Sequence, residues 1–193
     1  MAAGDLTTLA ACKAYLDLGS TVRDAVVSSA ITRASRALTV HCQREFVATD
    51  GQARTFRWAG GALDLAPYDL RAVTAITVGT DVPASQVVLT TDDWRLRPKP
   101  AADGVYQMVE LSTADPTGNG WPTDREVTIT GDWGFAAVPV DVEHWTIVTV
   151  ATWLRQTFAP FVEDTQESLI PEPANLPWSA KAGLRHYRRM QAS

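Results

Sequence analysis

The spacing of hydrophobic and polar residues changes twice along the chain, and these changes divide the sequence into three sections. Up to residue 42, apolar side chains recur with the period of an amphipathic helix. Between residues 52 and 131, polar and branched residues alternate in short runs separated by glycine, proline and aspartate, as in β-strands joined by turns. From residue 139 the helical period returns. This order predicts an α+β fold: a helical bundle of about three main helices plus a short C-terminal helix, with an inserted antiparallel β meander that forms a small barrel or sandwich.

Two helices are predicted at the amino-terminal end, over residues 6–18 and 21–42. The second begins with a capping-box pattern, in which a hydroxyl residue, Thr21, precedes an acidic residue by three positions. Small residues that include Ala30 and Ala34 lie along this helix. Because small side chains let another helix approach closely, the second helix is expected to pack against a neighbouring helix.

The third helix is predicted over residues 139–158 and is apolar on two sides. The stretch from His144 to Leu154 has no formal charge at neutral pH. Its β-branched run, Thr146 to Val150, would also suit a strand, but about twenty residues without a turn signal exceed the length of an ordinary strand. A helix apolar on two sides is buried on two sides, either as a central core helix or with one face on another copy of the chain. The uncharged part is shorter than the roughly 20 residues that cross a membrane, so no membrane partner is expected.

A single domain over residues 1–158 is expected to carry an acidic, proline-containing linker over 159–178 and a basic docking helix over 179–193. Aromatic residues and arginines dominate the binding energy of many protein interfaces. The C-terminal helix is therefore either a docking element for another protein or a loosely packed terminus. The docking candidates are Trp178, Leu184, Arg185, Tyr187, Arg188 and Arg189.

The composition is that of a globular protein with a hydrophobic core, because 46% of the 193 residues are hydrophobic and 20% are charged. Residues 1–5 lack the basic region and apolar core of a signal peptide. Cys12 and Cys42 both lie in predicted helices, and we expect them to be free buried thiols. The net charge of −5 is uneven, since residues 101–150 hold eight acidic side chains and one basic one. No basic face of the kind that grips nucleic acid is apparent.

The sequence carries no recognisable catalytic, metal or cofactor motif. The three histidines lie in three separate predicted helices, without the cysteine or carboxylate spacing of a metal site. There is no nucleophile elbow and no phosphate-binding glycine loop followed by a helix and lysine. Trp121 and Trp133, near predicted loops, have the chemistry to stack on sugars, although such tryptophans more often lie in a core or interface. We therefore predict no enzyme, no metal and no cofactor.

Short motifs follow one another in a fixed order and spacing along residues 5–158, and a further group lies in the tail. They are Leu6-Thr7, Lys13, Leu16, Asp24, Ile31, Ala34-Ser35, Arg44, Phe46, Leu65, Pro67, Val73 to Val78, Val127 to Gly131, Trp133-Gly134-Phe135, Val138-Pro139, Leu176-Pro177, Leu184 and Tyr187-Arg188-Arg189. In this order the chain resembles the head–tail connector (adaptor, or head-completion) proteins of long-tailed bacteriophages and gene transfer agents. Two parts depart from the family pattern: Gln43 stands where the family often has glycine, and the acidic linker matches the family poorly.

The resemblance implies a structural virion protein of the head–tail neck, assembled in the host bacterial cytoplasm. It implies a homo-oligomeric ring, usually twelvefold, that binds the portal protein and a downstream neck or tail-completion protein and lets DNA pass without specific binding. Candidate ring contacts are Ala30, Ala34, Trp145 and Trp153. An acidic wall would leave DNA mobile, and the candidate channel-facing acids are Asp103, Glu110, Asp115 and Asp124. The alternative for these acids is an outer surface that they keep soluble.

Two other functions compete with that of a connector. One is a different ring component of the neck or tail-completion assembly, which would bind other partners. The other is a carbohydrate-binding β module of a host-recognition structure, using Trp121 and Trp133. The helices predicted on both sides of the β insertion argue against such a module, since lectin-like modules are normally all-β.

Overall fold

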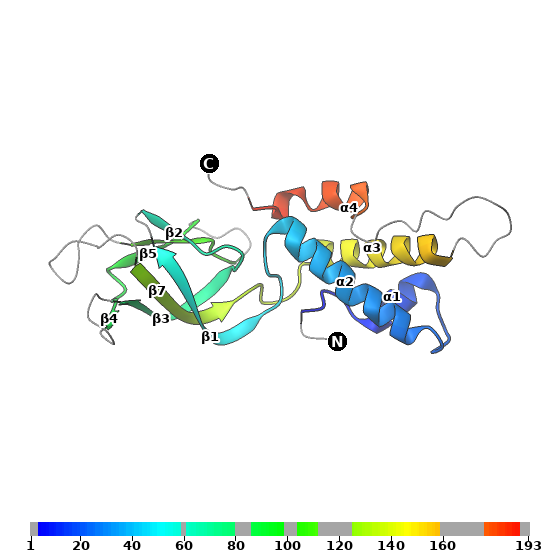
Figure 1. Cartoon of the computed structure of the whole chain (residues 1–193), viewed down its shortest axis with the longest axis horizontal. Coiled ribbons are helices and arrows are strands. Elements are labelled where there is room, and N and C mark those ends of the chain that lie inside the picture. Colours follow the sequence, from blue (N-terminus) through cyan, green and yellow to red (C-terminus); the bar gives the residue numbers. More distant parts are fainter. Residues whose placement is uncertain are drawn as a thin grey trace. The chain divides into compact units, whose positions relative to one another are not determined.

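The computed structural model describes residues 4–58, 61–79, 86–98, 104–111, 125–158 and 176–189. The chain divides into two compact units, one helical and one built of β-strands (Figure 1). The helical unit comprises Met1–Arg44 and Val138–Ser193, and the β unit comprises Glu45–Ala137. The helices are α1 (Leu9–Leu16), α2 (Asp24–Cys42), α3 (Val140–Phe158), α4 (Trp178–Gly183) and the 3-10 turn η2 (Arg185–Tyr187). The strands are β1 (Thr49–Trp58), β2 (Ala62–Asp64), β3 (Leu70–Gly79), β4 (Gln86–Val88), β5 (Trp94–Arg97), β6 (Met108–Leu111) and β7 (Arg125–Trp133). The predicted α+β class is confirmed.

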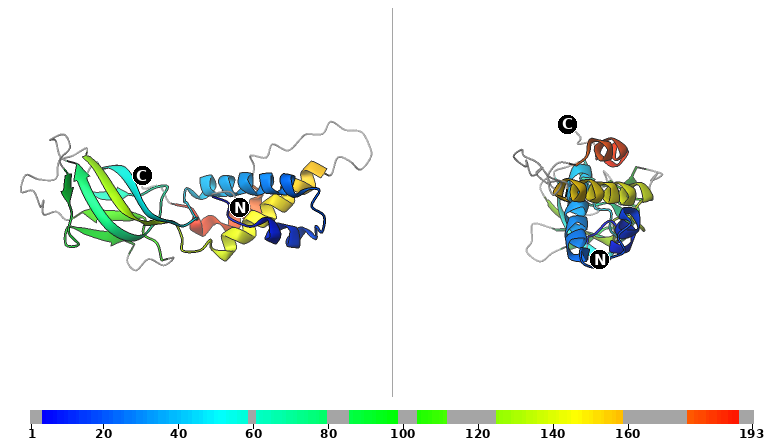
Figure 2. Two further views of the ribbon diagram at one scale, coloured as in Figure 1. Left: turned by 90° about the horizontal axis from the view of Figure 1, so that it is seen from below. Right: turned by 90° about the vertical axis from the view of Figure 1, so that its right-hand side faces the viewer.

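Helix α3 is the element around which the helical unit is built, because it contacts α1, α2 and α4 (Figure 2). Val142 and Val150 are fully buried. Two hydroxyl side chains, Thr146 and Thr149, are also buried, and each donates to the backbone carbonyl four residues earlier at 2.7 Å. Because these bonds satisfy both hydroxyls inside the helix, the β-branched run is compatible with a buried helix. The prediction of a helix rather than a strand is confirmed.

The first two helices begin later than predicted. The amide of Leu6 donates to the hydroxyl of Ser35 at 2.9 Å, and α1 starts only after Thr8, whose hydroxyl accepts from the amide of Ala11. No capping box forms at the start of α2. The carboxylate of Asp24 instead pairs with Lys13 on α1 at 2.6 Å, and α2 begins at Asp24 itself. The side chain expected to start a helix thus joins two helices.

The end of α2 shows why glycine would be the usual residue at position 43, where this chain has glutamine. Gln43 caps the helix with φ of 53°, in the left-handed region where glycine is the usual residue. Its amide donates to the carbonyls of Thr39 and Val40, which otherwise have no partner inside the helix. A glutamine therefore occupies this cap at some conformational cost.

The β unit consists of two antiparallel sheets that share one core. One sheet has the order β1-β7-β3-β4 and the other β2-β6-β5. A barrel and a sandwich were the two predicted alternatives. The two sheets form a sandwich, and no closed barrel is found among the described strands. The shared core contains Trp58, Leu63, Leu65, Leu70, Ile76, Val78, Leu89, Val109, Leu111, Val127, Ile129 and Trp133.

The strand order is not that of a simple meander. The first strand, β1, pairs with the last, β7, in a register that places Phe56 opposite Val127. Strand β7 then pairs with β3 on its other side. The chain consequently enters and leaves the β unit on adjacent strands, which is how a β unit can be inserted between α2 and α3 without separating the two ends of the helical unit in space.

Candidate functional site

The C-terminal segment, Leu176–Arg189, packs within the helical unit. Leu184 is fully buried, and the amide of Arg189 donates to the carbonyl of Cys42 at 3.0 Å. Gly183 lies so close to the indole of Trp145 on α3 that an added Cβ atom would overlap the ring. The segment is therefore a covered part of the helical unit, and its helix is shorter than predicted because α4 ends at Gly183 and gives way to η2. The linker predicted before it lies almost entirely outside the described residues.

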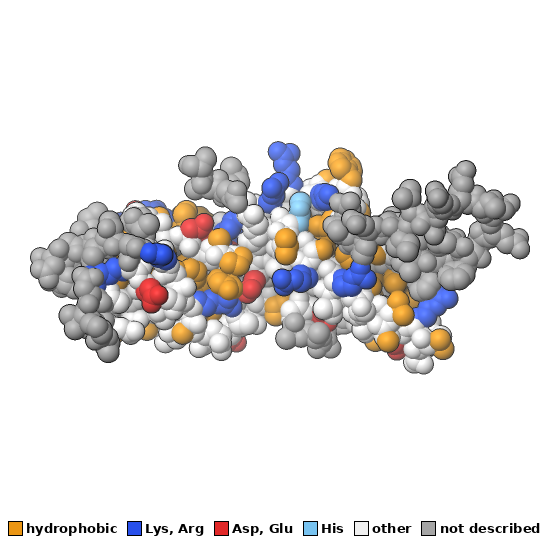
Figure 3. Space-filling view, viewed as in Figure 1, with side chains coloured by type: hydrophobic (Ala, Val, Ile, Leu, Met, Phe, Trp, Pro, Cys, Tyr) orange, Lys and Arg blue, Asp and Glu red, His pale blue; other side chains and the backbone are white. Residues whose placement is uncertain are grey.

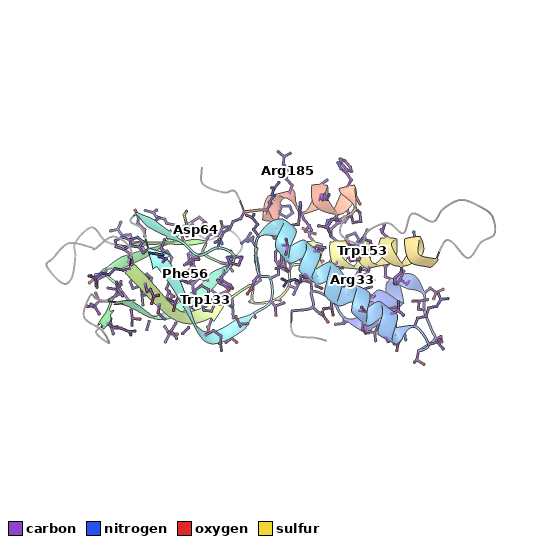
Figure 4. All side chains as sticks on the ribbon, in the orientation of Figure 1. Arg33, Phe56, Asp64, Trp133, Trp153 and Arg185 are labelled. Carbon is purple, nitrogen blue, oxygen red and sulfur yellow. The ribbon has the colours of Figure 1, made fainter. Side chains whose placement is uncertain are left out.

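The predicted docking residues fall into two groups. Leu184, Tyr187 and Arg189 are covered by their own chain and hold the segment to its own unit. Their role as partner anchors stays a prediction. Trp178, Arg185 and Arg188 are exposed, Trp178 at 83%. Figure 4 shows the side chain of Arg185 directed away from the ribbon. Only these three retain the exposure that a docking residue needs.

The predicted ring contacts are also mostly internal. Ala34 is fully buried, and Ala30 and Trp153 are each 8% exposed. The guanidinium of Arg33 on α2 lies 5.9 Å from the centroid of the Trp153 ring on α3 (Figure 4). The small residues of α2 therefore admit a helix of the same chain, and their role in a ring interface stays a prediction. Trp145 is half-buried beside Gly183.

The helical unit also exposes large apolar side chains that, apart from Trp178, sequence reasoning missed. The most exposed are Val22 at 87%, Trp178 at 83% and Val140 at 80%. Val22 precedes α2, and Val140 is the first residue of α3, so neither valine belongs to the apolar stripe of a helix. This position is the signal that could have identified them. Among the described residues of this unit, the exposed large apolar side chains are Tyr15, Val22, Val26, Val40, Val140 and Trp178.

The acids predicted to face a channel are mostly outside the described residues, which leaves Asp103, Asp115 and Asp124 as predictions. Glu110 lies on β6, where its carboxylate pairs with the guanidinium of Arg97 on β5 at 2.8 Å. Both side chains are nearly half exposed, so this ion pair contributes little to stability. The ion pair nevertheless neutralises the charge of Glu110, the one predicted channel-facing acid that lies among the described residues.

Trp133 is a core residue of the β unit. Its side chain is fully buried, and its indole N–H donates to the carbonyl of Gln52 at 2.7 Å. The guanidinium of Arg54 lies 5.2 Å from the centroid of the Trp133 ring and 3.6 Å from that of Tyr68. A buried ring with its N–H already satisfied offers no face to a sugar, so the carbohydrate-binding prediction is wrong for Trp133. Trp121 lies outside the described residues.

Within the described ranges, no group of three or more histidine, cysteine or acidic side chains is arranged to hold a metal ion. No helix in the described part of the chain has the length and apolar character needed to cross a membrane. Cys12 and Cys42 are free and fully buried, as predicted. Burial raises the pKa of each thiol from 9.0 to about 11, which disfavours the reactive thiolate.

We expect both thiols of the native protein to resist a disulfide reagent at pH 8 and to react fully after denaturation. The pKa of each thiol is higher in the folded protein than in the unfolded chain. The contribution of the two protonated thiols to folding stability is therefore complete below about pH 9 and is lost as the pH rises towards 11. Denaturation midpoints measured across this range should fall. The variant carrying Cys12→Ala and Cys42→Ala should show a shallower fall, and an equal fall would contradict the assignment of this pH dependence to the thiols.

Comparison with known proteins gives one informative likeness. Neither a family model nor a curated protein matches the sequence. Among solved structures, a chain of the structure described as "Neck of empty GTA particle computed with C6 symmetry" superposes with a TM-score of 0.60 and 18% sequence identity. The match covers 100% of this chain and 94% of that chain. The protein therefore shares its fold, over its whole length, with a chain of that particle neck.

Proposed function

We propose that the protein is a structural component of the neck of a phage-like particle, where it forms a ring at the head–tail junction. The observation that carries the proposal is the full-length fold likeness to a chain of a GTA neck. The order of the sequence motifs, which resembles that of head–tail connectors, supports the same function independently. The neck in that structure was computed with sixfold symmetry, and a ring of six or twelve copies fits such symmetry.

In this proposal the protein is a non-enzymatic virion component that contacts other copies of itself, the portal protein and a downstream neck or tail-completion protein. DNA passes through the ring without specific binding, along a wall to which Asp103, Asp115 and Asp124 contribute negative charge. Copies meet through exposed apolar side chains of the helical unit, among them Val22 and Val140. Such contacts are heterologous and close by rotation, so each copy uses two different surfaces.

A second ring component of the same neck is the competing function, because the similar chain belongs to a particle neck and the likeness does not assign it a position there. The two functions differ in the neighbour that is contacted. Both place the protein in the virion, at the junction between head and tail.

Particles assembled without this protein should show DNA-filled or emptied heads without attached tails in electron micrographs. The reason is that a ring between portal and tail provides the surface on which the tail is seated. Complementation with the intact gene is the control and should restore tailed particles. Normally tailed particles that lack the protein would contradict a neck function, and tailed particles that fail only to adsorb to host cells would favour a host-recognition role.

A further inference from the structure

We propose that α2 and the C-terminal segment together form one docking surface for an acidic protein surface. The α2–tail surface is defined by exposed cationic side chains on these two elements: Arg33, Arg36, Lys181, Arg185 and Arg188. The inference rests on the proposed function, in which the portal protein is a partner. It adds that the portal protein meets the α2–tail surface with acidic groups. It adds two arginines of α2 to the exposed docking residues of the tail.

Two observations place the C-terminal segment beside α2. The amide of Arg189 donates to the carbonyl of Cys42 at the end of α2. The positive charges of Arg188 and Lys181 also act on His41 in the last turn of α2, where burial first, and then these charges, lower the pKa of its imidazole. The cations of the tail therefore lie near the C-terminal part of α2, although they are far from it in sequence.

The spacing of residues places the α2 cations on a single exposed stripe. Arg33, Arg36 and Val40 follow one another at intervals of three and four residues, and all three side chains are exposed. On the tail, Lys181, Arg185 and Arg188 are spaced at intervals of four and three residues and are exposed as well. Figure 3 shows Lys and Arg side chains over α2 and α4 on one face of the molecule.

No acidic side chain of these two segments offsets the positive charge, because residues 25–44 and 176–189 contain no aspartate or glutamate. The acid that approaches the tail from α3 is Asp141, whose carboxylate lies 4.0 Å from the imidazole of His186, with both side chains exposed. A cluster of like charges repels itself and attracts an oppositely charged surface over a distance of about 8–10 Å at physiological salt. The α2–tail surface thus has the electrostatic character that an acidic partner requires.

The apolar residues beside these cations favour a protein partner over nucleic acid. Trp178 at the start of α4 is 83% exposed, and Val40 on the α2 stripe is 63% exposed. Exposed tryptophan and arginine together are the composition of protein interface hot spots. Contacts to a DNA backbone come from cationic and small polar side chains, and an exposed valine adds nothing to them.

The test measures binding to the purified portal ring of the same particle at low and high salt. The variants Arg36→Glu and Arg188→Glu reverse one charge on each element, and each should weaken binding about tenfold and reduce its salt dependence. Arg155→Glu is the matched control: it makes the same charge change on an exposed residue of α3, about 15 Å along the helix from Trp145. The control should bind like the wild type. Arg36→Lys should also retain binding, because it keeps the charge.

A labelled DNA duplex of mixed sequence is the second probe, measured at the same salt concentrations. Failure of the wild type to bind the portal ring would overturn the proposed function and this inference with it. Wild-type binding that neither Arg36→Glu nor Arg188→Glu changes would overturn the inference alone. Loss of duplex binding in both variants, with portal binding unchanged, would identify the surface as a nucleic-acid contact and equally overturn it.

Discussion

Replacing Gly134 with alanine should lower the free energy of unfolding by more than about 3 kcal/mol, the largest effect we expect from a single methyl group in this protein. Gly134 has φ of 74°, and an added Cβ atom would overlap the backbone carbonyl oxygen of Val47. Its amide also donates to the carbonyl of Asp69 at 2.7 Å. Because the clash involves backbone on both sides, relief requires the chain to move away at the end of β7.

Gly51→Ala is the matched control, and chemical denaturation of both variants is the measurement. Gly51 also has a positive φ, of 63°, but an added Cβ atom there would have no neighbour within 4 Å. This substitution should therefore lower the free energy of unfolding only by the cost of holding alanine in the left-handed conformation, about 1–2 kcal/mol. The difference between the two variants isolates the steric overlap at Gly134. Equal losses of stability would show that the close approach to Val47 is not what requires glycine.

Gly183→Val should release the C-terminal segment from the helical unit and expose the thiol of Cys42 to a disulfide reagent. A side chain at position 183 would overlap the indole of Trp145 by far more than a small shift can relieve. Because the indole is large and half-buried on α3, we expect the segment to move rather than the ring. The segment is also held by the bond from Arg189 to the carbonyl of Cys42, which breaks when the segment leaves. We expect Cys42 to react with the reagent at least about a hundredfold faster than in the wild type, because protection by burial depends on the fraction of molecules in the closed state.

Ala182→Val is the control for this prediction, since it places the same side chain on an exposed neighbouring position of α4. Ala182→Val lowers the helix propensity of this short helix, whereas Gly183→Val raises it. Propensity alone would therefore release the segment more in the control, and only the overlap with Trp145 predicts the opposite order. Cys12, in α1, serves as an internal reference and should stay protected in both proteins. Equal reactivity of Cys42 in the two variants would contradict the role of the Gly183 contact, and simultaneous exposure of Cys12 would indicate unfolding of the whole unit.

Local sequence patterns were sufficient for the type and order of the main elements. The helical period around α3, with its long run free of turn signals, predicted a buried helix, and the alternation between residues 52 and 131 predicted the antiparallel strands. Both signals arise from the geometry of the backbone, which repeats about every 3.6 residues in a helix and every two in a strand. The buried state of Cys12 and Cys42 was predicted from their place in the two amino-terminal helices.

Element boundaries depended on partners that are distant in sequence. Thr21 and Asp24 match a capping box, but Asp24 is drawn to Lys13 on another helix. Leu6 fits the apolar stripe of α1, yet its amide bonds to Ser35 and the helix starts later. A local pattern specifies which bonds a residue can make, and the packing of other segments decides which of them it makes.

The identity of the covering surface was decided by the tertiary structure alone. Leu184, Tyr187 and Trp153 have the composition of interface anchors, and their sequence context is the same whether the surface that covers them belongs to a partner or to their own chain. Trp133 near a turn looks like an exposed aromatic residue until Arg54 and Tyr68 are seen to enclose it. Burial is a property of pairs of surfaces brought together by long-range folding. The sequence therefore determined which apolar residues have to be buried. Only the tertiary structure determined which surface buries them, and which cations on α2 and the C-terminal segment stay exposed.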